Sequence, residues 1–115
     1  MKFFKYLFIA LVIIFGICKL EFVDDVSVDD LKIKYAQAPS KFISIGNIKV
    51  HYKSEGVEND TLPLVLLHST EASLHTFDAW VNELKQYKKV IRLDLPAFGL
   101  TGPFEDRNYK ISQYT

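Results

Sequence analysis

The sequence has only one cysteine, Cys18, among its 115 residues, so no internal disulfide and no Cys-x-x-Cys metal or redox motif can form. Its three histidines, His51, His68 and His75, lack the spacing of metal ligands. It also lacks a basic excess, because 14 basic residues balance 14 acidic ones. A basic surface is the usual requirement for nucleic-acid binding. We therefore expect no metal, no cofactor and no nucleic-acid partner.

The composition is that of a folded protein. Apolar residues make up 49% of the chain and charged residues 24%, which argues against disorder. The length suits one ordinary domain. We divide the chain into a membrane anchor or signal segment at 1–22, a polar connector at 23–41, and a partial domain at 42–115.

The first segment, "MKFFKYLFIALVIIFGICKLEF", is apolar on every face and carries no charge from Tyr6 to Cys18. It is as long as a signal-peptide core, and it approaches the length of a spanning helix if Lys5 snorkels. Acidic residues follow it: Glu21, Asp24, Asp25, Asp29 and Asp30. With Lys2 and Lys5 before the segment, this charge order predicts a cytoplasmic N-terminus and an extracytoplasmic domain. The small-x-small pattern of a cleavage site is poor, so we expect a retained single-pass anchor; cleavage is the alternative and would give a secreted protein.

The connector is expected to contain a short helix. Three apolar residues define one side of it: Val26, Leu31 and Tyr35. Asp29 or Asp30 is the expected N-terminal cap, and Pro39 is expected to stop the helix.

The stretch "KFISIGNIKVHYKSEG" has the alternation of a β-hairpin. Gly46-Asn47 is the expected turn. Ile48, Val50 and Tyr52 would then share one face. His51 falls on the other, polar face, and we expect it to point to solvent and to have no role.

A parallel strand–helix–strand unit follows. Leu64–Leu67 is continuously apolar, as in a strand buried on both faces. The next apolar residues recur at helical spacing: Phe77, Trp80, Val81, Leu84 and Tyr87. Ser73 or Thr76 could cap this helix, and 90–95 forms the second strand. Ser112 is the expected N-cap of one more helix. The fold class is therefore α/β, with an antiparallel hairpin before a parallel βαβ unit.

Several pieces of the sequence, in this order, resemble the N-terminal part of the α/β-hydrolase superfamily (AB hydrolase-1 type). They are the connector "LKIKYAQAPSKF", "VHYKSEG", "PLVLLHS" with "SLHTFDAW", "VIRLDLPAFGLTG" and "NYKIS". The resemblance runs from about Leu31 to Thr115. It implies an incomplete α/β-hydrolase sheet preceded by a hydrophobic helix, because the family's sheet has more strands than this chain supplies.

In that family, the turn after the third strand supplies a backbone N–H to the oxyanion hole. The resemblance places His68 and Ser69 on the family's His-Gly pair. Ser69 and Thr70 are then the candidate oxyanion-hole residues, with the N–H of Thr70 as donor. His68, Asp94 and Gly99 are implied as supports of the surrounding loops.

Two family glycines are replaced here, by Ser69 and by Ala97. If Ser69 has a left-handed backbone, the strain is about 1–2 kcal/mol. Such strain could be tolerated or could move the N–H donor.

No G-x-S-x-G surrounds any serine of this chain. In the family, the nucleophile sits on the turn after the fifth strand, and the acid and histidine follow it. We therefore expect no catalytic residue in this chain. The expected function is that of an N-terminal fragment of a membrane-anchored hydrolase, inactive alone. If downstream sequence completed it, it would hydrolyse a small-molecule ester or amide by serine-type chemistry. The alternative is a non-catalytic membrane-tethered remnant or binding module of the same fold. A dinucleotide-binding unit is disfavoured because no G-x-G-x-x-G follows a strand.

Overall fold

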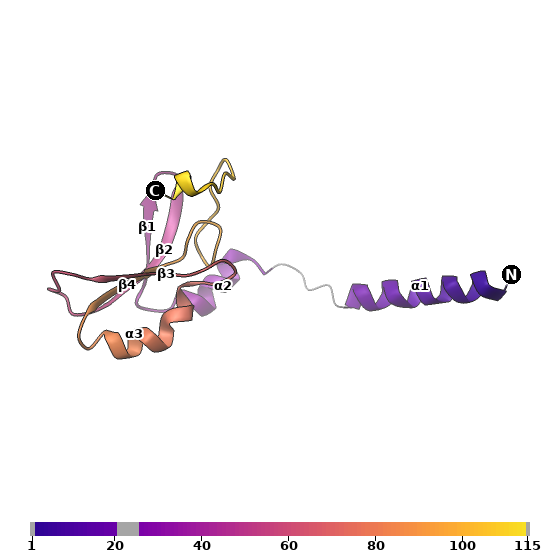
Figure 1. Cartoon of the computed structure of the whole chain (residues 1–115), viewed down its shortest axis with the longest axis horizontal. Helices are drawn as coiled ribbons and strands as arrows, with labels where there is room; N and C mark the ends of the chain where they lie inside the picture. Colours follow the sequence, from indigo (N-terminus) through magenta and orange to yellow (C-terminus); the bar gives the residue numbers. More distant parts are fainter. Residues whose placement is uncertain (1, 21–25, 115) are drawn as a thin grey trace.

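The computed structural model describes residues 2–20 and 26–114, and Figure 1 shows its helices and strands. In chain order they are α1 (Lys2–Leu20), α2 (Val28–Tyr35), β1 (Ser40–Ile45), β2 (Ile48–Gly56), β3 (Leu64–Leu67), the 3-10 helix η1 (Leu74–Phe77), α3 (Asp78–Leu84), β4 (Lys89–Leu93) and the 3-10 helix η2 (Ile111–Gln113). β1 thus begins two residues before the domain boundary expected from sequence. Ser112 lies inside η2 rather than at its N-cap, which is Lys110.

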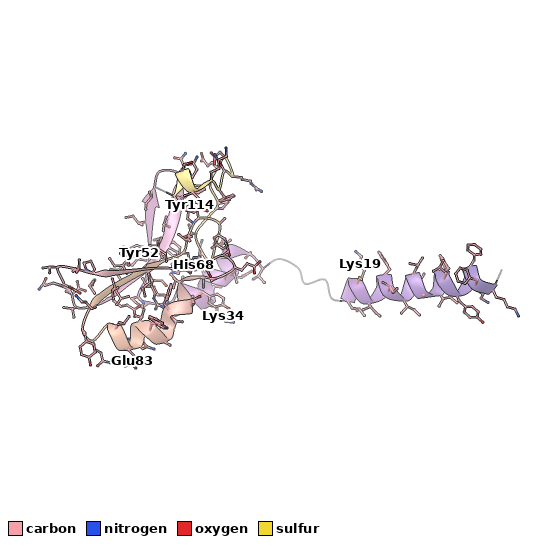
Figure 2. All side chains as sticks on the ribbon, viewed as in Figure 1. Lys19, Lys34, Tyr52, His68, Glu83 and Tyr114 are labelled. Carbon is pink, nitrogen blue, oxygen red and sulfur yellow. The ribbon has the colours of Figure 1, made fainter. Side chains whose placement is uncertain are left out.

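Helix α1 is a continuous apolar helix of 19 residues. None of its side chains is buried, and they project on all sides (Figure 2). Its length and composition suffice to cross a membrane, although a signal sequence has the same properties. The acidic residues Glu21, Asp24 and Asp25 lie outside the described part of the chain.

Helix α2 is capped by Ser27, not by Asp29 or Asp30 as predicted. The Ser27 hydroxyl oxygen accepts a hydrogen bond from the Asp30 N–H at 3.2 Å. Serine is as good a cap as aspartate, and the two acids instead occupy the first turn, where they favour the helix dipole. At the other end, the Tyr35 ring lies 5.6 Å from the His75 ring, so α2 rests against the segment that follows β3.

The strands form one four-stranded sheet in the order β1-β2-β4-β3. β1 and β2 are the predicted hairpin, in which Ile45 pairs with Ile48 across a turn at Gly46 and Asn47. Gly46 has a φ of 56°, a conformation that glycine adopts without strain. β2 pairs antiparallel with β4, and β3 pairs parallel with β4. The predicted hairpin and parallel βαβ unit are both confirmed.

One face of the sheet is covered by η1 and α3. Val90 and Arg92 of β4 point to that side, and both are buried together with Val81 of α3. The opposite face carries Val65 and Leu67 of β3, whose exposed fractions are 54% and 58%. No helix among the described residues covers that face, so these two side chains remain exposed.

The predicted apolar stripe on the helix is only partly correct. Val81 is fully buried, but Trp80 is 66% exposed and Tyr87 is 76% exposed. The segment starts as a 3-10 helix through Phe77, which winds more tightly than an α-helix and shifts the phase of the residues after it. Tyr87 lies beyond Leu84, where α3 ends.

Candidate functional site

The candidate site lies where β3 and β4 end. Residues 68–73 follow β3 and residues 94–101 follow β4. Because the two strands are parallel neighbours, both loops leave the same edge of the sheet. This is the edge at which open α/β sheets place their ligands.

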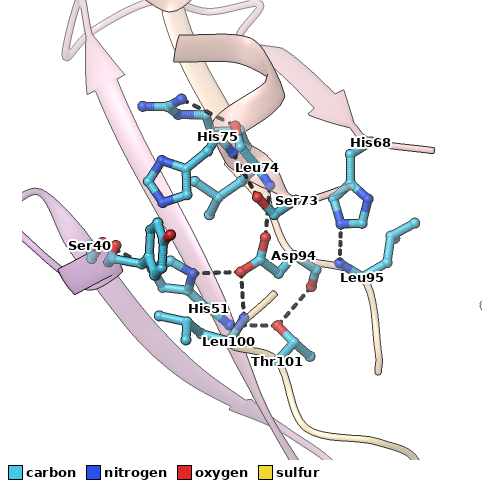
Figure 3. Close-up of polar contacts among 12 residues, drawn as sticks. Ser40, His51, His68, Ser73, Leu74, His75, Asp94, Leu95, Leu100 and Thr101 are labelled. Atoms are coloured by element: carbon cyan, nitrogen blue, oxygen red, sulfur yellow. Dashed lines mark hydrogen bonds and ion pairs between the residues drawn. The ribbon is translucent and has the colours of Figure 1, made fainter. Parts of the chain in front are cut away.

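His68 joins the two loops. Its Nδ1 lies 2.7 Å from the Ser69 carbonyl oxygen. Its Nε2 lies 3.0 Å from the Leu95 backbone nitrogen, a contact drawn in Figure 3. The ring is 4% exposed, and the Phe98 ring meets it edge-on with centroids 5.6 Å apart. His68 therefore ties the turn after β3 to the loop after β4.

The turn after β3 is strained at a different residue from the one expected. Ser69, which stands where the family has glycine, does not have a positive φ, whereas Glu71 has a φ of 60°. A left-handed Glu71 costs about 1–2 kcal/mol. Serine at position 69 therefore leaves the turn geometry unstrained at that position.

Thr70 stands at the wall of an apolar pocket of about 500 Å³. The other lining residues are Leu95, Ala97, Phe98, Tyr109 and Tyr114. Within residues 2–20 and 26–114, no hydrogen-bond acceptor pairs with the backbone N–H of Thr70. A donor that is free at the wall of an apolar pocket can bind an oxygen that develops negative charge.

Ala97, the second replacement of a family glycine, has a left-handed backbone with a φ of 68°. Its N–H donates to the Gly102 carbonyl at 3.1 Å, which holds the loop closed. An alanine in this conformation costs about 1–2 kcal/mol relative to glycine. The loop beside the pocket therefore stores strain that glycine would relieve.

Asp94 organises both loops (Figure 3). Its Oδ1 accepts the Leu74 N–H at 2.8 Å, and its Oδ2 accepts the Leu100 N–H at 2.8 Å and contacts His51 Nδ1 at 2.7 Å. Its backbone carbonyl accepts the Thr101 hydroxyl at 2.8 Å. The side chain is 1% exposed. One buried carboxylate thus anchors η1, the loop after β4, and β2.

The pKa of Asp94 lies below its ordinary value. Burial opposes ionisation and would raise the pKa, but the hydrogen bond from His51 and the N–H groups of Leu100 and Leu74 together outweigh it. The carboxylate is therefore ionised at neutral pH. It accepts hydrogen bonds at both oxygens, as this network requires.

His51 was expected to face solvent, and that prediction is wrong. Its ring is fully buried, with Nδ1 on Asp94 and Nε2 2.9 Å from the Ser40 hydroxyl oxygen. This is the bonding order of a serine–histidine–aspartate triad. However, the Phe42 ring stacks on the imidazole at 4.9 Å, and no substrate can reach a histidine so enclosed. We therefore assign a structural role, and not a catalytic one, to Ser40, His51 and Asp94.

Position 99 requires glycine because it lies directly against the Asp94 carboxylate. A Cβ at this position would lie 2.2 Å from Asp94 Oδ2, and its φ is 53°. Any other residue would collide with the carboxylate and strain the backbone. Gly99 therefore allows the Leu100 N–H to reach the carboxylate.

The buried Arg92 was missed by the sequence reasoning. Its guanidinium donates to Glu55 at 2.9 Å, to Asp78, and to the Leu74 carbonyl at 3.2 Å. The ion pair with Asp78 holds the first turn of α3 against the sheet. In the described part of the chain, no cluster of three histidine, cysteine, aspartate or glutamate residues is suited to a metal ion.

No protein-family model and no curated protein matches this sequence. Solved structures do match. The Cif epoxide hydrolase from Acinetobacter nosocomialis is 24% identical over 80% of this chain, with a TM-score of 0.61. A putative lipase from Acinetobacter baumannii is 26% identical over 81%, also with a TM-score of 0.61. A membrane phospholipase A described as a bacterial virulence factor is 22% identical over 98%, with a TM-score of 0.62.

The match covers only part of each of these proteins. It includes 32% of the epoxide hydrolase, 32% of the lipase and 37% of the phospholipase, so this chain spans about a third of their length. The chain carries the N-terminal part of the α/β-hydrolase fold.

Proposed function

We propose that this chain forms the oxyanion-binding wall of a membrane-anchored α/β-fold hydrolase. The observation that carries this proposal is that Thr70 lines an apolar pocket and that its N–H has no hydrogen-bond acceptor among the described residues. In the completed site, a serine would attack an ester or amide carbonyl, a histidine would act as its base, and an acid would orient the histidine. Those three groups would come from outside this chain.

Thr70 would contribute through its backbone alone. As the carbonyl becomes tetrahedral, its oxygen gains negative charge, and an N–H at about 2.7–3.1 Å from that oxygen stabilises it. Ser69 precedes Thr70 and contributes its carbonyl to the His68 contact. A chain with the donor but without the nucleophile has no covalent step to accelerate, so we expect no hydrolysis by residues 1–115 alone.

The proposal places α1 in a membrane. Its exposed apolar surface and its length support this, and so does the alignment over 98% of the chain with the membrane phospholipase A, which must include α1. With Lys2 and Lys5 on the cytoplasmic side, the sheet would lie on the other side. Seven residues separate Leu20 from Val28, so α2 would start within about 28 Å of the membrane end of α1.

The test is a pair of substitutions at one position, made in the protein that carries the complete active site. Thr70→Pro removes the amide hydrogen, and we expect kcat to fall by about 100-fold or more. Thr70→Ala keeps the amide and removes only the side chain, so its kcat should stay close to that of the original protein. Equal activity of the two variants would contradict the role of Thr70. Labelling of chain 1–115 by a fluorophosphonate probe would contradict the absence of a nucleophile.

The second candidate is a non-catalytic membrane-tethered module of the same fold. The left-handed Ala97 favours it, because a strained replacement beside the pocket is easier to retain when no reaction depends on the loop. The nucleotide sequence after the codon for Thr115 separates the two proposals. An in-frame G-x-S-x-G supports the hydrolase, and its absence supports the module.

A further inference from the structure

We propose that His68 is a positioning residue that sets the direction of the Thr70 N–H. It does so by binding the carbonyl of the same peptide group. This inference rests on the proposed role of Thr70 as an oxyanion donor. It assigns His68 a specific task, beyond general support of the loop.

The peptide group between Ser69 and Thr70 determines the geometry of this contact. The carbonyl of Ser69 and the N–H of Thr70 belong to one trans peptide, so they lie in one plane and point in opposite directions. His68 Nδ1 lies 2.7 Å from the Ser69 oxygen. When this contact fixes the carbonyl, the N–H must point away from His68. A hydrogen bond to the carbonyl also polarises the amide and strengthens its N–H as a donor.

The partners of His68 determine its protonation. A backbone N–H can only donate, so the Leu95 N–H at 3.0 Å requires an unprotonated Nε2. A carbonyl oxygen can only accept, so the Ser69 oxygen requires a proton on Nδ1. The ring is therefore the neutral Nδ1–H tautomer. Histidine in water favours the other neutral tautomer, which gives this assignment a clear spectroscopic signature.

Contacts with the core in turn fix the position of His68. Leu95 follows directly after Asp94, whose carboxylate is held by three hydrogen bonds. The Phe98 ring confines the imidazole from the side. Asp94 thus fixes the Leu95 N–H, this N–H fixes the ring of His68, and the ring fixes the peptide that carries the Thr70 donor.

The test uses nuclear magnetic resonance on the full chain, labelled with 15N, in detergent micelles. We expect the imidazole nitrogens to show the Nδ1–H tautomer. We also expect a 15N–15N coupling through the hydrogen bond between the Leu95 nitrogen and His68 Nε2. A ring in the Nε2–H tautomer, or one averaged between tautomers, overturns the proposal.

Two variants separate the two contacts of the ring. The amide of His68→Asn can replace Nδ1 as donor to Ser69, while His68→Gln can replace Nε2 as acceptor for Leu95. We expect the Thr70 amide proton to keep its chemical shift in H68N and to move in H68Q. Slow hydrogen exchange at Leu95 should persist in H68Q and be lost in H68N.

The matched controls are His75→Asn and His75→Gln. His75 follows the same turn, but its ring contacts Asp78 instead. These variants should leave the Thr70 and Leu95 signals unchanged. If both His68 variants move Thr70 equally, or if neither does, the proposal is overturned. These measurements on His68 need no substrate. A failed hydrolase assay would therefore count against the proposed function and would leave the measured geometry of the His68 contacts unchanged.

Discussion

Asp94 Oδ2 lies 2.7 Å from His51 Nδ1, and both side chains are almost completely excluded from solvent. The contact joins the last residue before the Leu95 loop to the middle of β2. The backbone reinforces it, because the Asp94 N–H donates to the His51 carbonyl at 2.9 Å. The loop after β4 is therefore held by a residue inside the sheet.

The first prediction concerns Asp94→Asn. The amide replaces an acceptor by a donor at one of the two oxygens, so a hydrogen bond from Leu74, Leu100 or His51 is lost and a buried donor is left unpaired. We expect the free energy of unfolding to fall by about 3 kcal/mol. Urea unfolding of the full chain in micelles measures this change. Asp106→Asn, at an exposed carboxylate that accepts the Asn108 N–H, should change the stability by a few tenths of a kcal/mol.

The second prediction concerns acid. Because the pKa of Asp94 is depressed in the folded protein, its contribution to stability is fully present above the ordinary aspartate pKa of 3.8. That contribution is lost as the pH falls through the lower, folded value. We expect the Leu74 and Leu100 amides to stay protected from hydrogen exchange down to about pH 4 and to lose protection below it. An inflection above pH 4 that disappears in Asp94→Asn would contradict the assignment.

The third prediction compares two glycines of one loop. Gly99→Ala places a Cβ against the Asp94 carboxylate and forces alanine to a φ of 53°. We expect a loss of about 2–4 kcal/mol in unfolding free energy. Gly102→Ala meets no atom within 4 Å and should be neutral or slightly stabilising. Equal effects of the two substitutions in thermal or urea unfolding would show that Gly99 does not contact the carboxylate.

The fourth prediction is a stabilising change. Ala97→Gly relieves the left-handed strain at a φ of 68°, and we expect the unfolding free energy to rise by about 1 kcal/mol. Ala72→Gly is the matched control. Ala72 does not have a positive φ, so glycine there should only add freedom to the unfolded chain and reduce stability. A decrease for Ala97→Gly would contradict the backbone geometry of the loop.

The fifth prediction uses the single cysteine to test the orientation in the membrane. In a Cys18→Ser background, Glu83→Cys places one thiol on the exposed side of α3 (Figure 2). We expect a membrane-impermeant maleimide to label it in intact cells. Phe3→Cys in the same background, which keeps both Lys2 and Lys5, should be labelled only after the cells are opened. The reverse pattern would place the sheet in the cytoplasm.

The strands could be predicted because their signals are local. Alternation between Ile48 and Tyr52 identifies a strand of the hairpin, and the continuous run at Leu64–Leu67 identifies a parallel strand. Both patterns depend only on neighbours in the sequence. The oxyanion turn and the roles of its residues came from the resemblance, since nothing in the spacing of His68 or Thr70 indicates chemistry.

The burial of His51 could not be predicted in this way. It shares one face of the strand with Lys49 and Lys53, a pattern that indicates a face in contact with solvent, but the loop carrying Asp94 and Thr101 covers that face. The partners lie 43 and 50 residues away in sequence. Periodicity detects which residues share a face and not what later covers it.

The position of β3 at the end of the strand order has a practical consequence for handling this polypeptide. Its outer side offers backbone donors and acceptors, and Val65 and Leu67 add apolar side chains beside them. The exposed edge of such a strand can pair with another extended segment through backbone hydrogen bonds. We expect isolated chains to self-associate through it as their concentration rises, and a peptide strand that docks there to keep them dispersed.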